Sequence, residues 1–267
     1  MGKSYRRKRV PGGTGVSPVF PPAPSTGETP VPPRPALQRM QCPNPAWVRE
    51  QFDRIAPHYD RLNNLLTFGL ENSWRRAMLR GTAAPKNARV VDVCAGTGEL
   101  SRLWLEEHPD AARVVLVDFS ERMLALAPGK LALPPAQIVA GDALALPLPD
   151  GSFDVALCGF SLRNLADWRA SLREIYRVLR PGGQALILEM CKEPWPAPVA
   201  FFIKRMVPLI GRMVSHEPAA YAWLPRSIEC FVPAAEVAAE MERAGFSGIT
   251  RRDMTWRIAT ALAGEKG

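Results

Sequence analysis

Short apolar runs alternate with amphipathic segments through the middle of the chain. Val90, Val91 and Val93 belong to an almost unbroken apolar run, which is typical of a parallel strand covered on both faces. Similar runs follow at 114–117, 137–140, 155–158 and 185–189. Residues 168–179 place apolar side chains at helical spacing behind Asp167, a residue suited to an N-cap. This alternation predicts an α/β domain with a parallel sheet.

Further elements are expected on both sides of these strands. Asn44-Pro45 predicts the start of a helix, and apolar residues recur at helical spacing over 48–55. Residues 234–244 are bracketed by proline and glycine and should form the last helix, before two closing strands over 246–262. An apolar stripe also follows residue 198. Its members are Phe201, Phe202, Met206, Leu209, Ile210 and Met213. Such a stripe fits core packing, a cover for an apolar tail or contact with a membrane surface.

The first strand leads directly into a glycine turn. Residues 89–100 read R-V-V-D-V-C-A-G-T-G-E-L. Gly96 and Gly98 allow the backbone to turn tightly and to approach a ligand closely, because they have no Cβ. A helix from about Glu99 would point its free N–H groups at whatever occupies that turn.

Three interpretations of this turn are open. A dinucleotide fingerprint requires G-x-G-x-x-G, and Ser101 stands at its third position. The stretch also resembles the acidic-x-G-x-G-x-G motif of S-adenosylmethionine (SAM) methyltransferases through Asp92, Gly96 and Gly98, with Cys94 in place of the first glycine. A tight turn without any ligand is the third interpretation.

Two acidic residues favour a nucleoside-containing cofactor. Asp118 ends the second run twenty positions after Gly98, where a carboxylate can accept both ribose hydroxyls, a feature that NAD enzymes share. The third run ends in Gly141-Asp142-Ala143, which resembles the G-D-A loop of many methyltransferases. In that resemblance Asp142 accepts from the adenine amino group and the Ala143 N–H donates to a ring nitrogen. Taken alone, Asp142 would more often cap a turn.

Length and charge limit the possible partners. A chain of 267 residues suits one α/β domain with added segments. Its net charge of +8 suggests nucleic acid or a membrane, but residues 1–40 hold seven basic residues against Glu28, which leaves only +2 for the rest. The basic cluster therefore predicts a solvated tail, and no nucleic-acid partner is expected. Residues 1–44 are rich in proline and glycine and are predicted to be disordered, while residues 45–267 form the domain.

Cysteine usage and hydropathy bear on the compartment. The five cysteines show no C-x-x-C spacing and are odd in number, which predicts free thiols in a reducing cytoplasm. No apolar run reaches the roughly 18–20 residues that a membrane span needs. We therefore expect a cytoplasmic protein with at most a peripheral contact with a membrane.

The segment after the first helix carries a specific family resemblance. Residues 55–76 read I-A-P-H-Y-D-R-L-N-N-L-L-T-F-G-L-E-N-S-W-R-R. They resemble the signature Y-D-x-M-N-x-x-L-S-x-x-x-H-x-x-W of the UbiE/MenG-type ubiquinone and menaquinone biosynthesis C-methyltransferases. The matching residues are Tyr59, Asp60, Asn63, Leu66 and Trp74. Leu62, Thr67 and Glu71 replace methionine, serine and histidine, so any role of that histidine is not carried over.

Two later segments extend the resemblance. Residues 159–165, G-F-S-L-R-N-L, resemble the family's S-F-G-L-R-N, with Gly159 where serine is common and Ser161 where glycine is. Residues 177–191, R-V-L-R-P-G-G-Q-A-L-I-L-E-M-C, resemble R-V-L-K-P-G-G-x-L-x-x-L-E-x-S, and the Pro-Gly-Gly is expected to stop the preceding helix. The chain has no Asn/Asp-Pro-Pro-aromatic loop after the fourth strand, which disfavours methylation of a base or an amine.

The resemblance implies a fold and an activity. The fold is the doubly wound class I SAM-methyltransferase sandwich, with residues 45–80 as a helical lid and 195–230 as a helical insertion over the strand carboxyl ends. The activity is transfer of the SAM methyl group to a ring carbon of a prenylated quinol, with demethylmenaquinol as the favoured substrate. Two alternatives stay open: a methyltransferase for another small molecule or a phospholipid, and a non-catalytic SAM-binding subunit of a biosynthetic complex.

The resemblance also implies the site residues. Those expected to bind SAM are Tyr59, Asp92, Gly96, Thr97, Gly98, Asp118, Asp142, Ala143 and Gly159. The Arg163 guanidinium, with Asn164 beside it, could hold the developing phenolate of the quinol, and a structural ion pair is the other interpretation of Arg163. His58 is a candidate proton acceptor, although an exposed histidine of the lid is the simpler interpretation. The oligomeric state does not follow from the sequence.

Overall fold

The computed structural model describes residues 44–80, 82–131, 136–214 and 218–267. The predicted tail therefore lies outside the described residues, apart from Asn44. The strands are β1 (Arg89–Val93), β2 (Arg113–Asp118), β3 (Ala136–Ala140), β4 (Phe153–Gly159), β5 (Leu179–Glu189), β6 (Phe246–Met254) and β7 (Ala259–Lys266). The helices before β4 are α2 (Pro45–Ile55), η1 (Ala56–His58), α3 (Tyr59–Leu66), α4 (Leu70–Leu79), α5 (Glu99–Glu107) and α6 (Glu121–Leu124). Those after β4 are η2 (Leu162–Asn164), α7 (Trp168–Val178), α8 (Ala197–Phe201), η3 (Phe202–Met206), α9 (Val207–Val214), α10 (Pro218–Cys230) and α11 (Ala234–Ala244).

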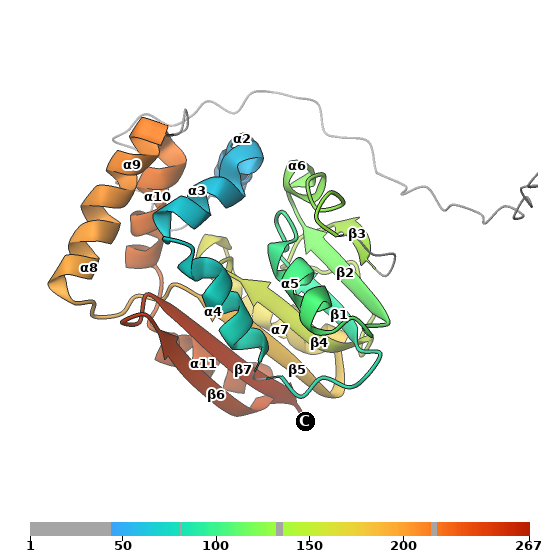
Figure 1. The fold of residues 1–267 in the computed structure, drawn as a ribbon. Coiled ribbons are helices and arrows are strands. Elements are labelled where there is room, and N and C mark those ends of the chain that lie inside the picture. Colours follow the sequence, from blue (N-terminus) through green and yellow to red (C-terminus); the bar gives the residue numbers. More distant parts are fainter. Residues whose placement is uncertain (1–43, 81, 132–135, 215–217) are drawn as a thin grey trace, which may run out of the picture. The chain divides into compact units, whose positions relative to one another are not determined.

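The seven strands of the described chain form one sheet in the order β3-β2-β1-β4-β5-β7-β6 (Figure 1). Strands β1 to β5 pair in parallel, and β7 runs antiparallel between β5 and β6. Successive residues of β1 face opposite layers: Val90 packs in one buried cluster with Trp104 of α5, and Val91 in another with Leu172 of α7. Helices on both faces thus bury the sheet, which confirms the doubly wound α/β prediction.

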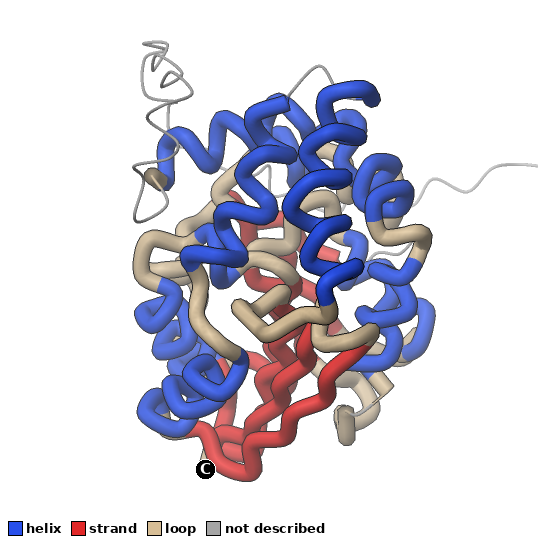
Figure 2. The backbone as a smooth tube through the Cα atoms, turned by 90° about the vertical axis from the view of Figure 1, so that its left-hand side faces the viewer, coloured by secondary structure: helices blue, strands red, loops and turns tan. Residues whose placement is uncertain are grey.

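The predicted first and last helices are both present. The Asn44 side chain accepts from the Trp47 N–H at 3.1 Å, so α2 begins where the Asn44-Pro45 pair predicts. Helix α11 spans the predicted residues and ends at Gly245, whose φ of 107° is the left-handed conformation of a helix C-cap. Figures 1 and 2 show α2, α3, α9 and α10 gathered at one end of the sheet.

One predicted helix stop lies in a strand instead. Helix α7 ends at Val178, and β5 begins at Leu179, so Pro181-Gly182-Gly183 lies inside β5 rather than at the helix end. The pairing of β5 with β4 jumps from Leu179 opposite Phe153 to Gln184 opposite Val155, so the turn is a bulge within the strand. A bulge and a helix stop use the same residue types, and the sequence pattern does not separate them.

In the insertion after β5, the buried side chains are not those of the predicted apolar stripe. Over residues 198–213 the buried side chains are Val199, Ile203 and Val207, which recur every four residues. Phe201, Leu209 and Met213 from the predicted stripe are 60%, 45% and 78% exposed. The reason is the π-helical turn η3, which shifts the buried row relative to an ideal helix. Within the described ranges, no helix combines the length and the apolar character that crossing a bilayer requires.

Candidate functional site

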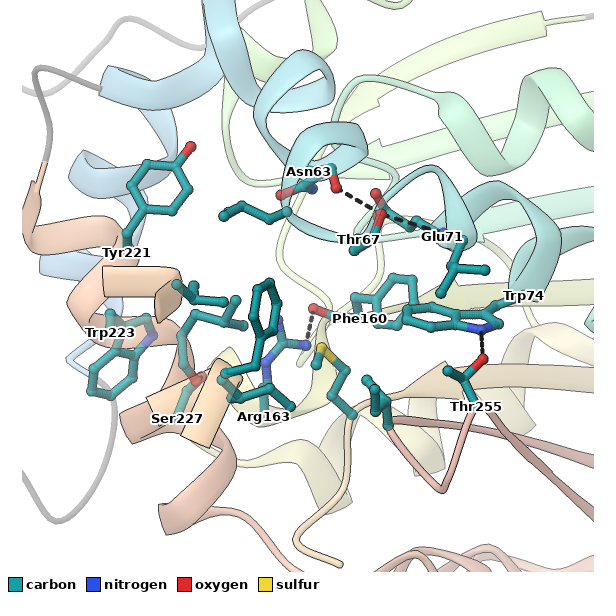
Figure 3. Close-up of a pocket in the computed structure, with 18 of the residues that line it drawn as sticks. Asn63, Thr67, Glu71, Trp74, Phe160, Arg163, Tyr221, Trp223, Ser227 and Thr255 are labelled. Atoms are coloured by element: carbon teal, nitrogen blue, oxygen red, sulfur yellow. Dashed lines mark hydrogen bonds between the residues drawn. The ribbon is translucent and has the colours of Figure 1, made fainter. Parts of the chain in front are cut away.

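Two adjoining cavities lie at the carboxyl ends of the parallel strands. The first, of about 550 Å³, is bounded by the ends of β1, β2, β3 and β4 and by α2; we name it the polar cavity. The second, of about 350 Å³, lies among α3, α4, the insertion helices and the β6–β7 turn; we name it the apolar cavity (Figure 3). Both volumes are in the range of small-molecule sites. Phe52, Tyr59, Phe160 and Asn164 border both cavities and form a shared wall.

The glycine turn borders the polar cavity through residues 94–97, whereas Gly98 does not line it. Gly96 and Gly98 have φ values of 55° and 77°, which glycine adopts without strain. A Cβ on Gly98 would lie 3.0 Å from side-chain carbons of Leu116 and Ala127, so this glycine also permits close packing of α5 on the sheet. Cys94, at the position of the missing first glycine, likewise has a positive φ of 57°.

Asp92, near the end of β1, is hydrogen-bonded to the residue that follows the glycine turn by three positions, Ser101. Its buried carboxylate accepts from the backbone N–H of Ser101 at 3.1 Å and from the Ser101 hydroxyl at 2.6 Å. Burial raises the pKa of Asp92 to about 7, although both hydrogen bonds oppose the shift. Ser101, which breaks the dinucleotide fingerprint, thus has a structural role here: its hydroxyl joins the start of α5 to β1.

Asp118 lies at the end of β2 with both oxygens oriented. Oδ2 accepts from the Gly96 N–H at 2.8 Å, and Oδ1 accepts from the Ser120 N–H at 2.8 Å. Burial raises the pKa of this carboxyl to about 6. The side chain borders the polar cavity, so a carboxylate of fixed direction is available there to accept from a diol.

The loop after β3 reaches the same cavity. Asp142 is exposed, borders the cavity and accepts from the Leu144 N–H at 2.9 Å, which is the turn-capping geometry of a short acidic residue. Ala143 is buried beside it and Gly159 borders the cavity from β4. Backbone N–H groups, apolar surface and a carboxylate from different strands therefore converge as an adenosine-sized ligand would require.

Thr97 makes a contact that sequence reasoning missed. Its hydroxyl donates to Oδ1 of Asp60 on α3 at 2.7 Å, and Nζ of Lys130 donates to the same hydroxyl at 2.8 Å. Lys130 also pairs with Asp60. The glycine turn is thereby linked to the N-terminal helices. Asp60 had a signal in the Y-D motif, whereas nothing in the local pattern marks Lys130.

Arg163 enters the apolar cavity from the 3₁₀ turn η2. Its Nη1 lies 2.5 Å from Oε1 of Glu189 and donates to the Phe160 carbonyl at 2.7 Å. Its Nε is buried and has no partner among the described residues. The alternative expected from the sequence, a structural ion pair, is therefore present, and the same side chain also lines the cavity (Figure 3).

The neighbours of Arg163 fix the shared wall. The Asn164 side chain accepts from the Trp223 indole N–H at 3.0 Å and donates to the Phe160 carbonyl at 3.4 Å. Tyr59 faces both cavities, and burial raises its pKa to about 12. His58, by contrast, is exposed and lines neither cavity, so the structure does not bring this candidate proton acceptor to the other site residues.

Comparisons with known proteins agree with this geometry. Residues 40–266 match the sequence profile of the ubiE/COQ5 methyltransferase family. A demethylmenaquinone methyltransferase of Thermus thermophilus is 38% identical over 80% of this chain and 99% of its own length. The ubiquinone/menaquinone biosynthesis C-methyltransferase UbiE of Geobacter sulfurreducens is 37% identical over 82% of this chain and 88% of its own length.

Solved structures share the fold at low sequence identity. A Haloferax volcanii methyltransferase complex with the Trm112 activator has a TM-score of 0.60 at 20% identity, over 80% of this chain and 96% of the other. A SAM-dependent methyltransferase of Thermotoga maritima also has a TM-score of 0.60 at 20% identity, with 82% and 100% covered. The [4+2]-cyclase SpnF has a TM-score of 0.60 at 18% identity, and the match covers 84% of this chain and 97% of the cyclase. The fold alone therefore does not select a reaction.

Proposed function

This chain belongs to the ubiE/COQ5 methyltransferase family, and from that premise we propose that it methylates a ring carbon of a prenylated quinol, with demethylmenaquinol as its substrate. It is a class I SAM-dependent C-methyltransferase. The observation that carries the substrate proposal is the pair of adjoining cavities, one polar and one apolar, with a single shared wall.

The residues of the polar cavity fit SAM. In this proposal Gly96, Thr97 and Gly98 lie under the methionine part, and Asp118 accepts from the ribose hydroxyls. Asp142 and Ala143 meet the adenine ring. Gly159 and Tyr59 complete the contacts, and Asp92 acts through the turn that it holds. Two of these assignments are supported by geometry: backbone N–H groups fix the Asp118 oxygens, and Gly96 borders the cavity. Gly98 instead lies close to the side chains of Leu116 and Ala127.

Bound SAM supplies an activated methyl group, so the protein mainly aligns the reacting carbon and excludes water. The shared wall performs both tasks in this proposal. Asn164 is held by hydrogen bonds at both ends of its amide, and the Phe160 ring packs 6.3 Å from that of Trp74, centroid to centroid. A quinol ring in the apolar cavity would lie against these side chains on the side that faces SAM.

Arg163 is proposed to stabilise the quinol oxygen. A ring carbon is nucleophilic only when that oxygen carries negative charge, and a buried guanidinium favours this charge. Glu189 and the Phe160 carbonyl hold Nη1, and Nε is buried, so Nη2 is the nitrogen left to meet a substrate. The ion pair thus orients Arg163 in this proposal and does not compete with its role.

Peripheral membrane contact forms part of the proposal, because a prenyl tail partitions into lipid. Phe68 and Trp256 border the apolar cavity and are 75% and 70% exposed, so an apolar path leads from the cavity to the surface. Phe201 and Met213 extend this apolar surface over the insertion. Exposed Arg205 and Arg212 lie on the same segment and suit anionic lipid head groups.

Anaerobic assays with purified protein, SAM and demethylmenaquinol test the proposal. Methylated quinol should form, and the oxidised quinone should give none, because it has no ionisable hydroxyl. Phospholipid and small amine acceptors should remain unmethylated. Equal turnover of quinone and quinol would contradict the carbon-nucleophile mechanism. SAM binding without product formation from quinol would favour the alternative of a non-catalytic subunit.

A further inference from the structure

The apolar cavity contains one acidic side chain that the proposed function has not used. Glu71, in the first turn of α4, is only 8% exposed and lines this cavity together with Arg163 (Figure 3). Among the described residues that border the cavity, it carries the only carboxylate, and none of them is a histidine. Its position is the one at which the family signature has histidine. A proton-accepting residue type therefore replaces another at this point.

The other ionisable groups of the cavity do not accept a proton at neutral pH. Burial raises the pKa of Tyr59 to about 12, and it also raises the pKa of Tyr221. Both phenols thus stay protonated at neutral pH and can donate, but cannot take up, a proton. Arg163 is a permanent cation. Glu71 is the remaining ionisable group that can accept a proton, and burial raises the pKa of this carboxyl above its ordinary value while Arg75 opposes the rise.

Arg75 fixes one oxygen of Glu71 and leaves the other available. Nη2 of Arg75 lies 2.5 Å from Oε1 of Glu71, one helical turn away, and no described residue donates to Oε2. Arg75 itself borders the polar cavity, and its guanidinium lies 5.6 Å from the ring centre of Phe160. The ion pair therefore extends along the shared wall from one cavity to the other.

We propose that Glu71 is the proton acceptor of the reaction, taking the hydroxyl proton of the quinol on Oε2 while Arg163 holds the oxygen. This inference rests on the proposed quinol substrate. The O–H bond breaks, its proton moves to Glu71 and its electron pair stays on oxygen. The negative charge of the oxygen is delocalised to a ring carbon, whose electron pair forms the new bond to the methyl group, while the electron pair of the broken carbon–sulfur bond stays on sulfur. The ring hydrogen leaves to water as a proton, and Glu71 returns its proton to the oxygen, so the balance releases one proton.

This assignment predicts a pH dependence with a defined sign. Glu71 accepts a proton only when ionised, so the rate falls as pH drops through its pKa. Burial raises that pKa, and the charges that face Glu71 adjust it: Arg75 lowers it, whereas Asp60 on α3 and Glu99 on α5 raise it. The acidic limb of the rate profile should therefore lie above the range of an ordinary glutamate.

Three variants test the assignment under anaerobic conditions. Glu71→Gln removes the acceptor and should lower the methyl-transfer rate by about 10²-fold or more at neutral pH, with SAM affinity retained. Its remaining rate should rise in proportion to hydroxide, as the quinol ionises unaided. Glu71→His restores an acceptor and should recover much of the rate. Glu240→Gln is the matched control: Glu240 is also 8% exposed and pairs with Arg243 along a helix, but it borders neither cavity.

A second measurement does not depend on turnover. Quinol bound to protein loaded with S-adenosylhomocysteine should show phenolate absorbance at higher pH in the wild type and Glu240→Gln than in Glu71→Gln, because the negative charge of Glu71 opposes ionisation of a hydroxyl that faces it. Equal phenolate profiles, or an acidic limb that persists in a folded Glu71→Gln, would overturn the assignment. A wild type that methylates no quinol would instead overturn the proposed function, before any comparison between variants.

Discussion

Nη1 of Arg163 and Oε1 of Glu189 lie 2.5 Å apart in a buried ion pair, at the edge of a cavity that is otherwise mostly apolar. Both oxygens of Glu189 are engaged, because Glu189 also accepts from the backbone N–H groups of Arg163 and Met190. Under the proposed function, removal of the arginine therefore has two separate effects, one on the quinol oxygen and one on a buried carboxylate that loses its partner.

Arg163→Met should lower the methyl-transfer rate by about 10²–10³-fold, the range for loss of one oxyanion donor, and should leave SAM affinity intact. It should also destabilise the fold by about 3–5 kcal/mol, since Glu189 stays buried without its partner. The double variant Arg163→Met, Glu189→Gln should recover stability but not rate, as measured by thermal unfolding and single-turnover kinetics. Arg163→Lys should regain only part of the rate. A near-wild-type rate in the double variant would leave Arg163 with a structural role only.

Asp118→Ala should weaken SAM binding by about 2–3 kcal/mol, through loss of a charge-assisted contact. Asp118→Asn keeps an acceptor for the Gly96 N–H and should therefore lose less SAM affinity than Asp118→Ala. Asp154→Asn serves as the control, because Asp154 is similarly buried but lies at the opposite end of its strand, where it pairs with Arg180. Isothermal calorimetry measures all three affinities. Unchanged affinity in Asp118→Ala would remove this residue from the ribose site.

Cofactor-free protein should lose stability as pH rises from about 4 to 8. Burial raises the pKa of Asp118 from 3.8 to about 6 and that of Asp92 to about 7, so the folded state holds these protons more tightly than the unfolded chain does. Their contribution is full below the unfolded pKa and is lost as pH passes the folded values. Asp92→Asn removes one of the two groups, and denaturant unfolding at several pH values should show a smaller decline. If the free energy of unfolding declines with pH equally in the variant and the wild type, the raised pKa of Asp92 is contradicted.

Thr97→Val should loosen the N-terminal helices without changing the side-chain shape. The variant loses the hydrogen bonds from Thr97 to Asp60 and from Lys130 to Thr97, each worth about 0.5–1.5 kcal/mol. Amide hydrogen exchange in α3 should therefore become faster by up to about tenfold per lost bond in cofactor-free protein. Thr250→Val, on exposed β6, is the control and should leave α3 unchanged. Equal exchange in both variants would mean that this contact does not hold α3 down.

The double variant Phe201→Ser, Met213→Ser should reduce co-sedimentation with vesicles of phosphatidylethanolamine and phosphatidylglycerol, because two large apolar side chains leave the contact surface. Neither residue borders a cavity, so methylation of a short-tailed, water-soluble quinol should persist. Leu126→Ser provides a control on a separate exposed apolar residue. Wild-type vesicle binding in the double variant would exclude the insertion as the membrane-contacting surface.

Local patterns were sufficient to predict the sheet and the polar cavity. The apolar runs of β1 to β5, the glycine turn after β1 and the Asn44 cap each depend on neighbours within a few residues, so their sequence signals are direct. The Pro-Gly-Gly of β5 was misassigned because one residue pattern serves two structures. The stripe after residue 198 kept its three interpretations, because the sequence does not separate Phe202, which borders the apolar cavity, from the exposed Phe201 and Met213.

The apolar cavity could not be assembled from the sequence in the same way. Its walls come from α3 and α4, from η2, from the insertion and from the β6–β7 turn, where Trp74 donates to Thr255 across 181 positions at 2.8 Å. Glu71 was visible as a departure from the family signature, but its burial and its position on the apolar cavity depend on those distant segments. The exposure of His58 likewise depends on how these distant segments pack, which the local sequence does not show.

The shared wall of Phe52, Tyr59, Phe160 and Asn164 has a consequence for inhibitor chemistry. A single ligand that joins an adenosine group to an apolar tail through a short linker would bind both cavities at once, and its second half would bind at an effective concentration on the order of millimolar. Adenosine analogues alone would meet only the polar cavity, whose glycine turn is shared with other enzymes of this fold. Selectivity for this protein would therefore come from the part of the ligand that binds in the apolar cavity.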